Sequence, residues 1–315
     1  MVKYDGYKMA GPGRPAAKIG KIEFLPAMDA QTQVARMIRG EQDMMTGVTA
    51  DQANNLAENP LCRVTVEDTV AFTLIQMDVT ARSGLEPFKD IRVRRALAHA
   101  INRPAIQAAL TPKSAHDIPV PGGMCHKWVT GCDFSYPFPE YDPAKAKKLL
   151  AEAGYPDGFE MRLTSWGPNK PLAELVSGDL HKVGIRASVE HLIYSVYAKK
   201  ARDGESQAMV TLWDNSGSNP DIDITTSYWF SPDNDNRDYT KDTDLHAATE
   251  TGRSIFDPAA RQAHYKKMFD KVNEQIYMVP LTALPAVVVH SKDLVLQGGH
   301  KELQGFYFNY LEWAK

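Results

Sequence analysis

The chain has 315 residues, of which 43% are hydrophobic and 24% are charged, and its formal net charge at pH 7 is −3. This composition is typical of a globular protein large enough for one large domain or two ordinary ones. The weakly acidic balance gives no attraction to nucleic acid or to an anionic membrane, so we expect no nucleic-acid partner. No apolar run approaches the roughly 18–20 residues that a membrane-spanning helix needs.

Strand and helix patterns alternate over the first part of the chain. Ile19–Leu25 alternates loosely before Pro26, which predicts a strand. The elements predicted after it are a helix over Asp29–Arg39, a short strand over Asp43–Thr46, a helix over Thr49–Leu56 and strands over Cys62–Val66 and Ala71–Val79. This order favours an α/β fold.

The stretch Phe88–Leu110 predicts two consecutive helices. Asp90 can cap the first helix, and Asn102 can cap the second ahead of Pro104. The apolar stripe of the first helix is Val93, Ala96, Leu97, Ala100 and Ile101, and its other faces carry Arg92, Arg94, Arg95 and His99. The pattern alone is that of any amphipathic pair.

A long loop rich in proline and glycine, Pro112–Pro139, follows these helices, and loops of this length are usually functional or mobile. Asp142–Pro156 then predicts a complete helix, with Asp142 as its cap and Gly154 at its end. The remaining predicted elements are strands over Phe159–Thr164, Ile185–Val189, Ala208–Trp213 and Ala286–His290, and helices over Pro171–Lys182 and Ser195–Asp203 and from Asp257 onward.

Three of these strings together carry a family resemblance. Phe88–Ile106 matches F-x-D-x-R-V-R-x-A-L-x-x-A-I-[DN]-R-x-x-I, and Tyr141–Tyr155 matches Y-[DN]-P-x-K-A-K-x-L-L-x-E-A-G-Y. Gly40-Glu41-Gln42-Asp43 stands where that family has Gly-Glu-x-Asp. The chain therefore resembles the oligopeptide/dipeptide/nickel-binding family (family 5) of ABC-transporter solute-binding proteins.

The resemblance implies a two-lobed, periplasmic-binding-protein-like α/β fold (type II, cluster C), with a complete second lobe and part of the first. Residues 1–71 would be part of lobe I, residues 72–291 lobe II, and residues 292–315 the return segment of lobe I. Relative to the family, the chain appears to lack an N-terminal portion, and no signal peptide is recognisable from Met1 onward. Localisation would be periplasmic by resemblance.

The function implied is that of the substrate-binding component of an ABC importer. Such a protein captures a peptide or similar small polar solute in an interlobe cleft and delivers it to a membrane permease. On this interpretation the chain is a monomer, is not an enzyme, and uses no cofactor or metal. Its ligand would be a di- or oligopeptide.

Two loops are the candidate ligand sites. The first is Trp213–Asp221, with Trp213, Asp214, Asn215 and Ser216 at its start; polar groups on a loop after a strand can line a crevice, although a surface turn has the same composition. In the peptide-binding members of the family, an aspartate in this loop pairs with the α-ammonium group of the ligand. Ser216 stands in its place, and Asp214 is the nearest carboxylate.

The second loop is Ser165–Lys170, from which Trp166, Asn169 and Lys170 could contact a ligand. Trp166 offers a flat wall, and Lys170 could supply a cation for a carboxylate or be an ordinary surface lysine. Tyr197 and Trp229 fit the crevice and the core equally well.

The three cysteines leave alternatives open. Cys62 lies in an apolar run and is expected to be buried, whereas Cys125 and Cys132 share one loop and could form a disulfide in an oxidising compartment. With His116 and His126 the same loop could instead serve a metal-dependent hydrolase, although the spacing fits no standard zinc motif. A third alternative is a binding module that has lost small-molecule transport.

Overall fold

The structure, a computed structural model, describes residues 1–3, 16–25, 29–132, 136–214, 221–232, 237–296 and 308–314. It contains two compact units. Unit 1 consists of Met1–Thr69, Ala108–Ile118 and Leu284–Lys315, and unit 2 of Val70–Gln107 and Pro119–Ala283. The assignment of residues 1–71, 72–291 and 292–315 to lobes stays a prediction. Within the described ranges, no helix is long and apolar enough to cross a membrane.

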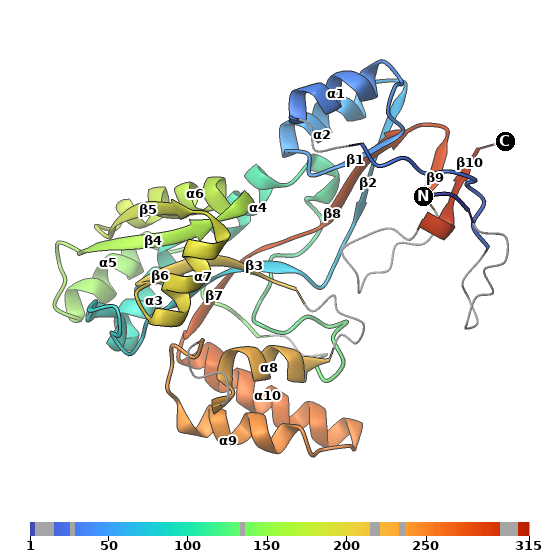
Figure 1. The fold of residues 1–315 in the computed structure, drawn as a ribbon. Helices are drawn as coiled ribbons and strands as arrows, with labels where there is room; N and C mark the ends of the chain where they lie inside the picture. The colour runs from blue at the N-terminus through green and yellow to red at the C-terminus, as the bar shows by residue number, and fades with distance from the viewer. Residues whose placement is uncertain are drawn as a thin grey trace. The chain divides into compact units, whose positions relative to one another are not determined.

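Unit 2 is built on a five-stranded mixed sheet with the strand order β5-β4-β6-β3-β7 (Figure 1). Its strands are β3 (Phe72–Met77), β4 (Glu160–Trp166), β5 (Arg186–Leu192), β6 (Ala208–Trp213) and β7 (Met278–Ala283). β4 runs parallel to β5 and β6, and β3 runs antiparallel to β6 and β7. β3 and β7 are buried along their whole length, which explains their nearly continuous apolar sequences.

The helices of unit 2 are α3 (Ile91–Ala100), α4 (Arg103–Leu110), α5 (Pro143–Glu152), α6 (Lys170–His181), α7 (Tyr194–Asp203), α8 (Ile222–Phe230), α9 (Thr243–Gly252) and α10 (Pro258–Glu274). The last turn of α4 belongs to unit 1. α6 packs on β4 and β5, α7 contacts β4, and α3 packs on α5. α9 contacts both α8 and α10, and the three form the orange group of Figure 1.

The helices α3 and α4, called here the motif helices, have the predicted caps. The Asp90 carboxylate accepts from the Arg92 backbone N–H at 2.8 Å, and Asn102 Oδ1 accepts from that of Ala105 at 3.2 Å. Because these bonds satisfy N–H groups left free in the first turns, each cap fixes where its helix begins. The apolar stripe is buried as expected.

Arg94 and His99 lie outside the apolar stripe of α3, yet both are buried, being only 4% and 8% exposed. Arg94 donates to the carbonyl oxygens of Phe88, Lys89 and Gln275 at 2.8–3.0 Å. His99 Nδ1 lies 2.7 Å from the carbonyl oxygen of Glu140. A buried guanidinium is tolerated here because carbonyl oxygens replace its water.

Arg103, at the start of α4, is buried in the same way. It donates to the carbonyl oxygens of Pro121 at 2.9 Å and Pro280 at 3.3 Å, and its guanidinium lies 4.4 Å from the centre of the Phe138 ring. Burial lowers the pKa of Arg103 to about 10, so it remains charged at neutral pH. Arg103 therefore links two points of the proline-rich loop, Pro121 and Phe138, to β7.

Unit 1 contains a three-stranded antiparallel sheet, β1 (Met44–Thr46), β8 (Ala286–Ser291) and β2 (Cys62–Glu67), with β8 in the centre. Its remaining elements are α1 (Ala30–Ile38), α2 (Ala50–Ala57), and the antiparallel pair β9 (Leu294–Leu296) and β10 (Leu311–Trp313). Thr49 and Gln52 form a capping box on α2. Cys62 is buried between the sheet and the helices, as predicted.

The strand predicted over Ile19–Leu25 is wrong. The described residues of this stretch form only a single bridge, between Val2 and Lys21. An alternating pattern predicts a strand only where a neighbouring strand supplies hydrogen bonds along its length, and here the pairing ends after one bridge.

Candidate functional site

An aromatic pocket of about 280 Å³ opens in unit 2 and lies wholly among residues of that unit. Its wall comes from the ends of β4 and β6, from α7 and α8, and from the segment after α8. The lining residues are Gln76, Trp166, Tyr194, Tyr197, Ala198, Ala201, Met209, Thr211, Leu212, Trp213, Asp214, Tyr228, Trp229, Arg237 and Tyr239.

One wall is a cluster of rings on β4 and α7. Trp166 is the last residue of β4, and its ring centre lies 4.7 Å from that of Tyr194 and 6.0 Å from that of Tyr197. Tyr194 and Tyr197 are three residues apart on α7 and therefore lie on one face of the helix. These rings give the pocket a flat, apolar side.

The second wall joins the end of β6 to α8. The ring of Trp213 lies 4.8 Å from Tyr228 and 5.4 Å from Trp229, measured between ring centres. The indole N–H of Trp213 donates to Thr225 Oγ1 at 2.9 Å, which fixes the ring orientation. This wall is consequently preformed.

The polar groups of the pocket are few, and one of them is a cation. Arg237 lies over the ring of Tyr228, 4.7 Å from its centre, and donates a hydrogen bond to the Tyr228 hydroxyl. The side chain of Gln76 donates to the Arg237 carbonyl oxygen at 3.0 Å and so holds the backbone at this point. Burial raises the pKa of Tyr228, and the charge of Arg237 opposes part of that rise. The phenol is therefore neutral at physiological pH.

Two further tyrosines of the pocket are also kept neutral. Burial raises the pKa of Tyr197 and that of Tyr239 above the ordinary phenol value. The Tyr239 hydroxyl donates to the carbonyl oxygen of Ala201 at 2.6 Å. The pocket thus presents aromatic surface, hydroxyl groups and one guanidinium.

The structure places some of the predicted ligand residues in this pocket and others outside it. Trp166, Trp213 and Asp214 line the pocket. Asn169 is buried but does not line it, and Lys170 is exposed, with its Nζ 3.8 Å from Glu174 of the same helix. Asn215 and Ser216 lie outside the described residues. A ligand role for Asn169, Lys170, Asn215 and Ser216 stays a prediction.

The sequence interpretation missed Gln76, Tyr194, Tyr228 and Arg237. Two sequence patterns could have identified the ring clusters: the three-residue spacing of Tyr194 and Tyr197, and the adjacent aromatic residues Tyr228 and Trp229. Nothing in the local sequence distinguishes Arg237 from a surface arginine. Gln76 reaches the pocket only because β3 pairs with β6.

The Cys/His loop gives no support to the hydrolase alternative. Cys125 and Cys132 are joined to each other by a disulfide, with their Cα atoms 5.6 Å apart, so neither sulfur is a thiolate able to bind a metal. Among the described residues, no group of three or more His, Cys, Asp or Glu side chains could hold a metal ion.

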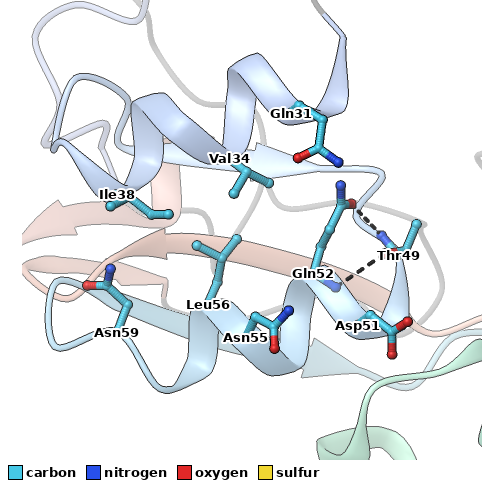
Figure 2. A pocket seen from close by; sticks show the side chains of 9 residues that line it. All are labelled: Gln31, Val34, Ile38, Thr49, Asp51, Gln52, Asn55, Leu56 and Asn59. Atoms are coloured by element: carbon cyan, nitrogen blue, oxygen red, sulfur yellow. Dashed lines mark hydrogen bonds between the residues drawn. The ribbon is translucent and has the colours of Figure 1, made fainter.

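A second hollow, of about 440 Å³, lies between α1 and α2 in unit 1 (Figure 2). Val34, Ile38 and Leu56 form its apolar part. Its polar lining consists of Gln31, Thr49, Asp51, Gln52, Asn55 and Asn59, and Gln52 is occupied by the capping box with Thr49. The described lining of this α1–α2 hollow contains neither an aromatic ring nor a cation, so the hollow offers a ligand fewer contacts than the aromatic pocket does.

The chain is similar in sequence to solute-binding proteins of known name. It is 28% identical over 309 residues to the glutathione-binding protein GsiB of Salmonella paratyphi A, a match that covers 93% of this chain and 57% of GsiB. GsiB of Escherichia coli strain K12 is likewise 28% identical over 305 residues. The chain thus spans little more than half the length of these relatives.

Solved structures show the same fold. The periplasmic binding protein DppA of Helicobacter pylori, in complex with the peptide STSA, matches with a TM-score of 0.73 and 22% identity over 91% of this chain and 56% of its own. NikA of Brucella suis, in complex with Fe(III)-EDTA, matches with a TM-score of 0.79 and 20% identity over 90% of this chain and 60% of its own.

These neighbours establish the two-lobed α/β fold that the sequence predicted. The sequence model of the "Bacterial extracellular solute-binding proteins, family 5 Middle" matches residues 1–237. Because that match covers well over half of the chain, the chain belongs to family 5 of the bacterial extracellular solute-binding proteins of ABC importers.

Proposed function

We propose that this chain captures a peptide or a similar small polar solute and delivers it to a membrane permease of an ABC importer in the periplasm. Family membership supports the general role. The observation that supports solute capture by this chain is the aromatic pocket, with preformed ring walls and a small number of polar groups. Such a combination is what small-molecule sites usually present.

The class of solute is proposed by analogy with the relatives. Glutathione and the peptide STSA are both peptides, named with GsiB and DppA. Ring walls bind the apolar faces of such a ligand, and hydroxyl, amide and charged groups fix its orientation. Trp213 and Asp214 begin the loop in which the sequence places the ligand contacts.

The experiment is the recovery of a solute from the purified protein. Extraction and mass spectrometry of protein expressed with a periplasmic leader should yield a bound peptide-like solute. Adding back that solute, glutathione or Ser-Thr-Ser-Ala should raise the unfolding temperature, because a ligand at 100 times its Kd stabilises a protein by about 2.7 kcal/mol. No recovered solute and no thermal shift with any of them would contradict the proposal.

A further inference from the structure

We infer that the aromatic pocket is selective for a flat, carboxylate-bearing group of the solute, with Arg237 as the residue that determines this selectivity. The inference rests on the proposed function, since it names the chemistry of the ligand at the same site. It concerns the pocket within unit 2 whose lining includes Trp213 and Asp214, the first two residues of the loop that the sequence identified.

The charge of Arg237 is the first reason. Its guanidinium is half-buried, and among the described residues no carboxylate lies within ion-pair distance of it. Its contacts are with the ring and hydroxyl of Tyr228, so most of its five N–H donors have no acceptor in the part of the chain that the structure describes. A planar guanidinium fixed in this way is suited to bind a carboxylate through two parallel hydrogen bonds.

The indole groups are the second reason. Trp229 is only 5% exposed, and the indole N–H groups of Trp229 and Trp166 have no acceptor among the described residues. A buried donor without a partner is costly, so a ligand oxygen that reached it would remove that cost. Trp166 and Trp229 line the same pocket as Arg237, from opposite ring clusters.

The charge balance of the lining is the third reason. Asp214 is the single carboxylate among the described lining residues, and it already has an interaction partner of its own. A cationic ligand group would be repelled by Arg237, and Asp214, which already has a partner, would not fully offset this repulsion. The pocket therefore favours an anion over a cation.

The size and shape of the pocket define the rest of the ligand group. Whole drug-sized ligands occupy pockets of about 300–1,000 Å³, so 280 Å³ suits one end of a solute, such as a planar side group. Rings on two sides favour a group that can stack on them.

The probes for the experiment are phenylacetate and phenylacetamide, which share the ring and differ in the charge of the end group. Binding is measured by quenching of tryptophan fluorescence, because Trp166, Trp213 and Trp229 line the pocket, and by calorimetry. The wild-type protein should bind phenylacetate at least about tenfold more tightly than phenylacetamide, which is a difference of about 1.4 kcal/mol in binding free energy. Arg237→Gln should abolish this preference, and Arg237→Lys should retain part of it.

Arg82→Gln is the matched control. Arg82 also lies over a tyrosine of the pocket, 5.0 Å from the ring centre of Tyr239, but it is exposed and does not line the pocket. Its variant should keep the full preference for phenylacetate. Equal binding of the two probes, binding of neither, or a preference that survives Arg237→Gln would overturn the inference.

The two proposals fail in different ways. A peptide-like solute recovered from a protein that shows no carboxylate preference would overturn the selectivity and leave solute capture intact. A carboxylate preference in a protein from which no solute is recovered, and which shows no thermal shift, would support the pocket chemistry and contradict solute capture.

Discussion

The motif helices and the aromatic pocket both contain arginine side chains, but the partners of these arginines differ. In the motif helices, Arg94 and Arg103 are buried, and each donates to two or more backbone carbonyl oxygens. In the pocket, Arg237 bonds to one tyrosine hydroxyl, and most of its N–H groups have no acceptor among the described residues. The number of protein acceptors around a guanidinium thus separates a structural arginine from a ligand-binding one.

The residues that stabilise the fold are therefore expected to differ from those that bind the ligand. None of the residues Phe88–Leu110 lines the pocket. Substitutions in the motif helices should therefore lower stability and leave affinity unchanged, and substitutions on the rim of the pocket should do the reverse.

The largest effect should follow Arg94→Met. This change removes a buried guanidinium from three carbonyl oxygens, which lose their partners, so the free energy of unfolding should fall by about 3 kcal/mol in urea denaturation. Arg95→Met is the matched control, because Arg95 is the next residue on the same helix but is exposed; we expect a change within about 0.5 kcal/mol. Similar losses for the two variants would show that Arg94 is not a structural anchor.

Tyr194→Ala tests the other side of the comparison. The side chain is 56% exposed and stacks near Trp166 on the pocket wall, so its loss should weaken phenylacetate binding by about threefold to tenfold. Unfolding free energy should change by less than about 1 kcal/mol. Phe256→Ala, which removes a 90% exposed ring outside the pocket, should leave affinity unchanged. A large loss of stability with unchanged affinity would break the distinction.

The third prediction concerns the hydrogen bonds that hold α9 in place. Asp242 caps α9 and accepts hydrogen bonds from Lys271 Nζ at 2.7 Å and from the Tyr277 hydroxyl at 2.9 Å. Burial raises the pKa of Asp242, but these two hydrogen bonds, the one from the Leu245 backbone N–H and the charge of Lys271 together lower it by more, so the net pKa lies below its ordinary value. Asp242→Asn should lower the free energy of unfolding by about 1–2 kcal/mol at pH 7.

The pH dependence of this loss has a definite sign. A carboxylate whose pKa is lowered by folding contributes stability above its unfolded pKa, near 3.9, and that contribution is lost as the pH falls through the folded value. The difference between wild type and Asp242→Asn should therefore shrink below about pH 4. Asp244→Asn is the control, because Asp244 contacts the same lysine but is 83% exposed; it should change stability by less than about 0.5 kcal/mol. If the difference in unfolding free energy between wild type and Asp242→Asn did not change with pH, the charge of Asp242 could not be the cause of the lost stability.

Local signals predicted most helices and strands of this chain. Caps such as Asp90, Asn102, Thr49 and Asp142 mark where helices begin because they satisfy N–H groups within the same few residues. β7 was not predicted, because its burial depends on β3, a strand that is distant in sequence. α9 was not predicted either, although the helices it contacts, α8 and α10, are its neighbours in the chain.

The site was less predictable than the fold, for a physical reason. The two tryptophans at strand ends, Trp166 and Trp213, could be recognised because a polar loop follows each strand. Gln76 and Arg237 come together only through tertiary packing, as their side-chain-to-backbone bond shows. Burial of Arg94 likewise depends on a carbonyl oxygen of Gln275, far along the chain.

The central position of β8 in the sheet of unit 1 has a consequence for synthesis. Among the described residues, β1 and β2 pair with β8 alone, which is translated more than two hundred residues after β2. At about 5–20 residues per second, both strands leave the ribosome on the order of ten seconds or more before their shared partner exists. The sheet of unit 1 therefore closes only after every strand of unit 2 has emerged, and two unpaired strand edges must stay free of other chains until then.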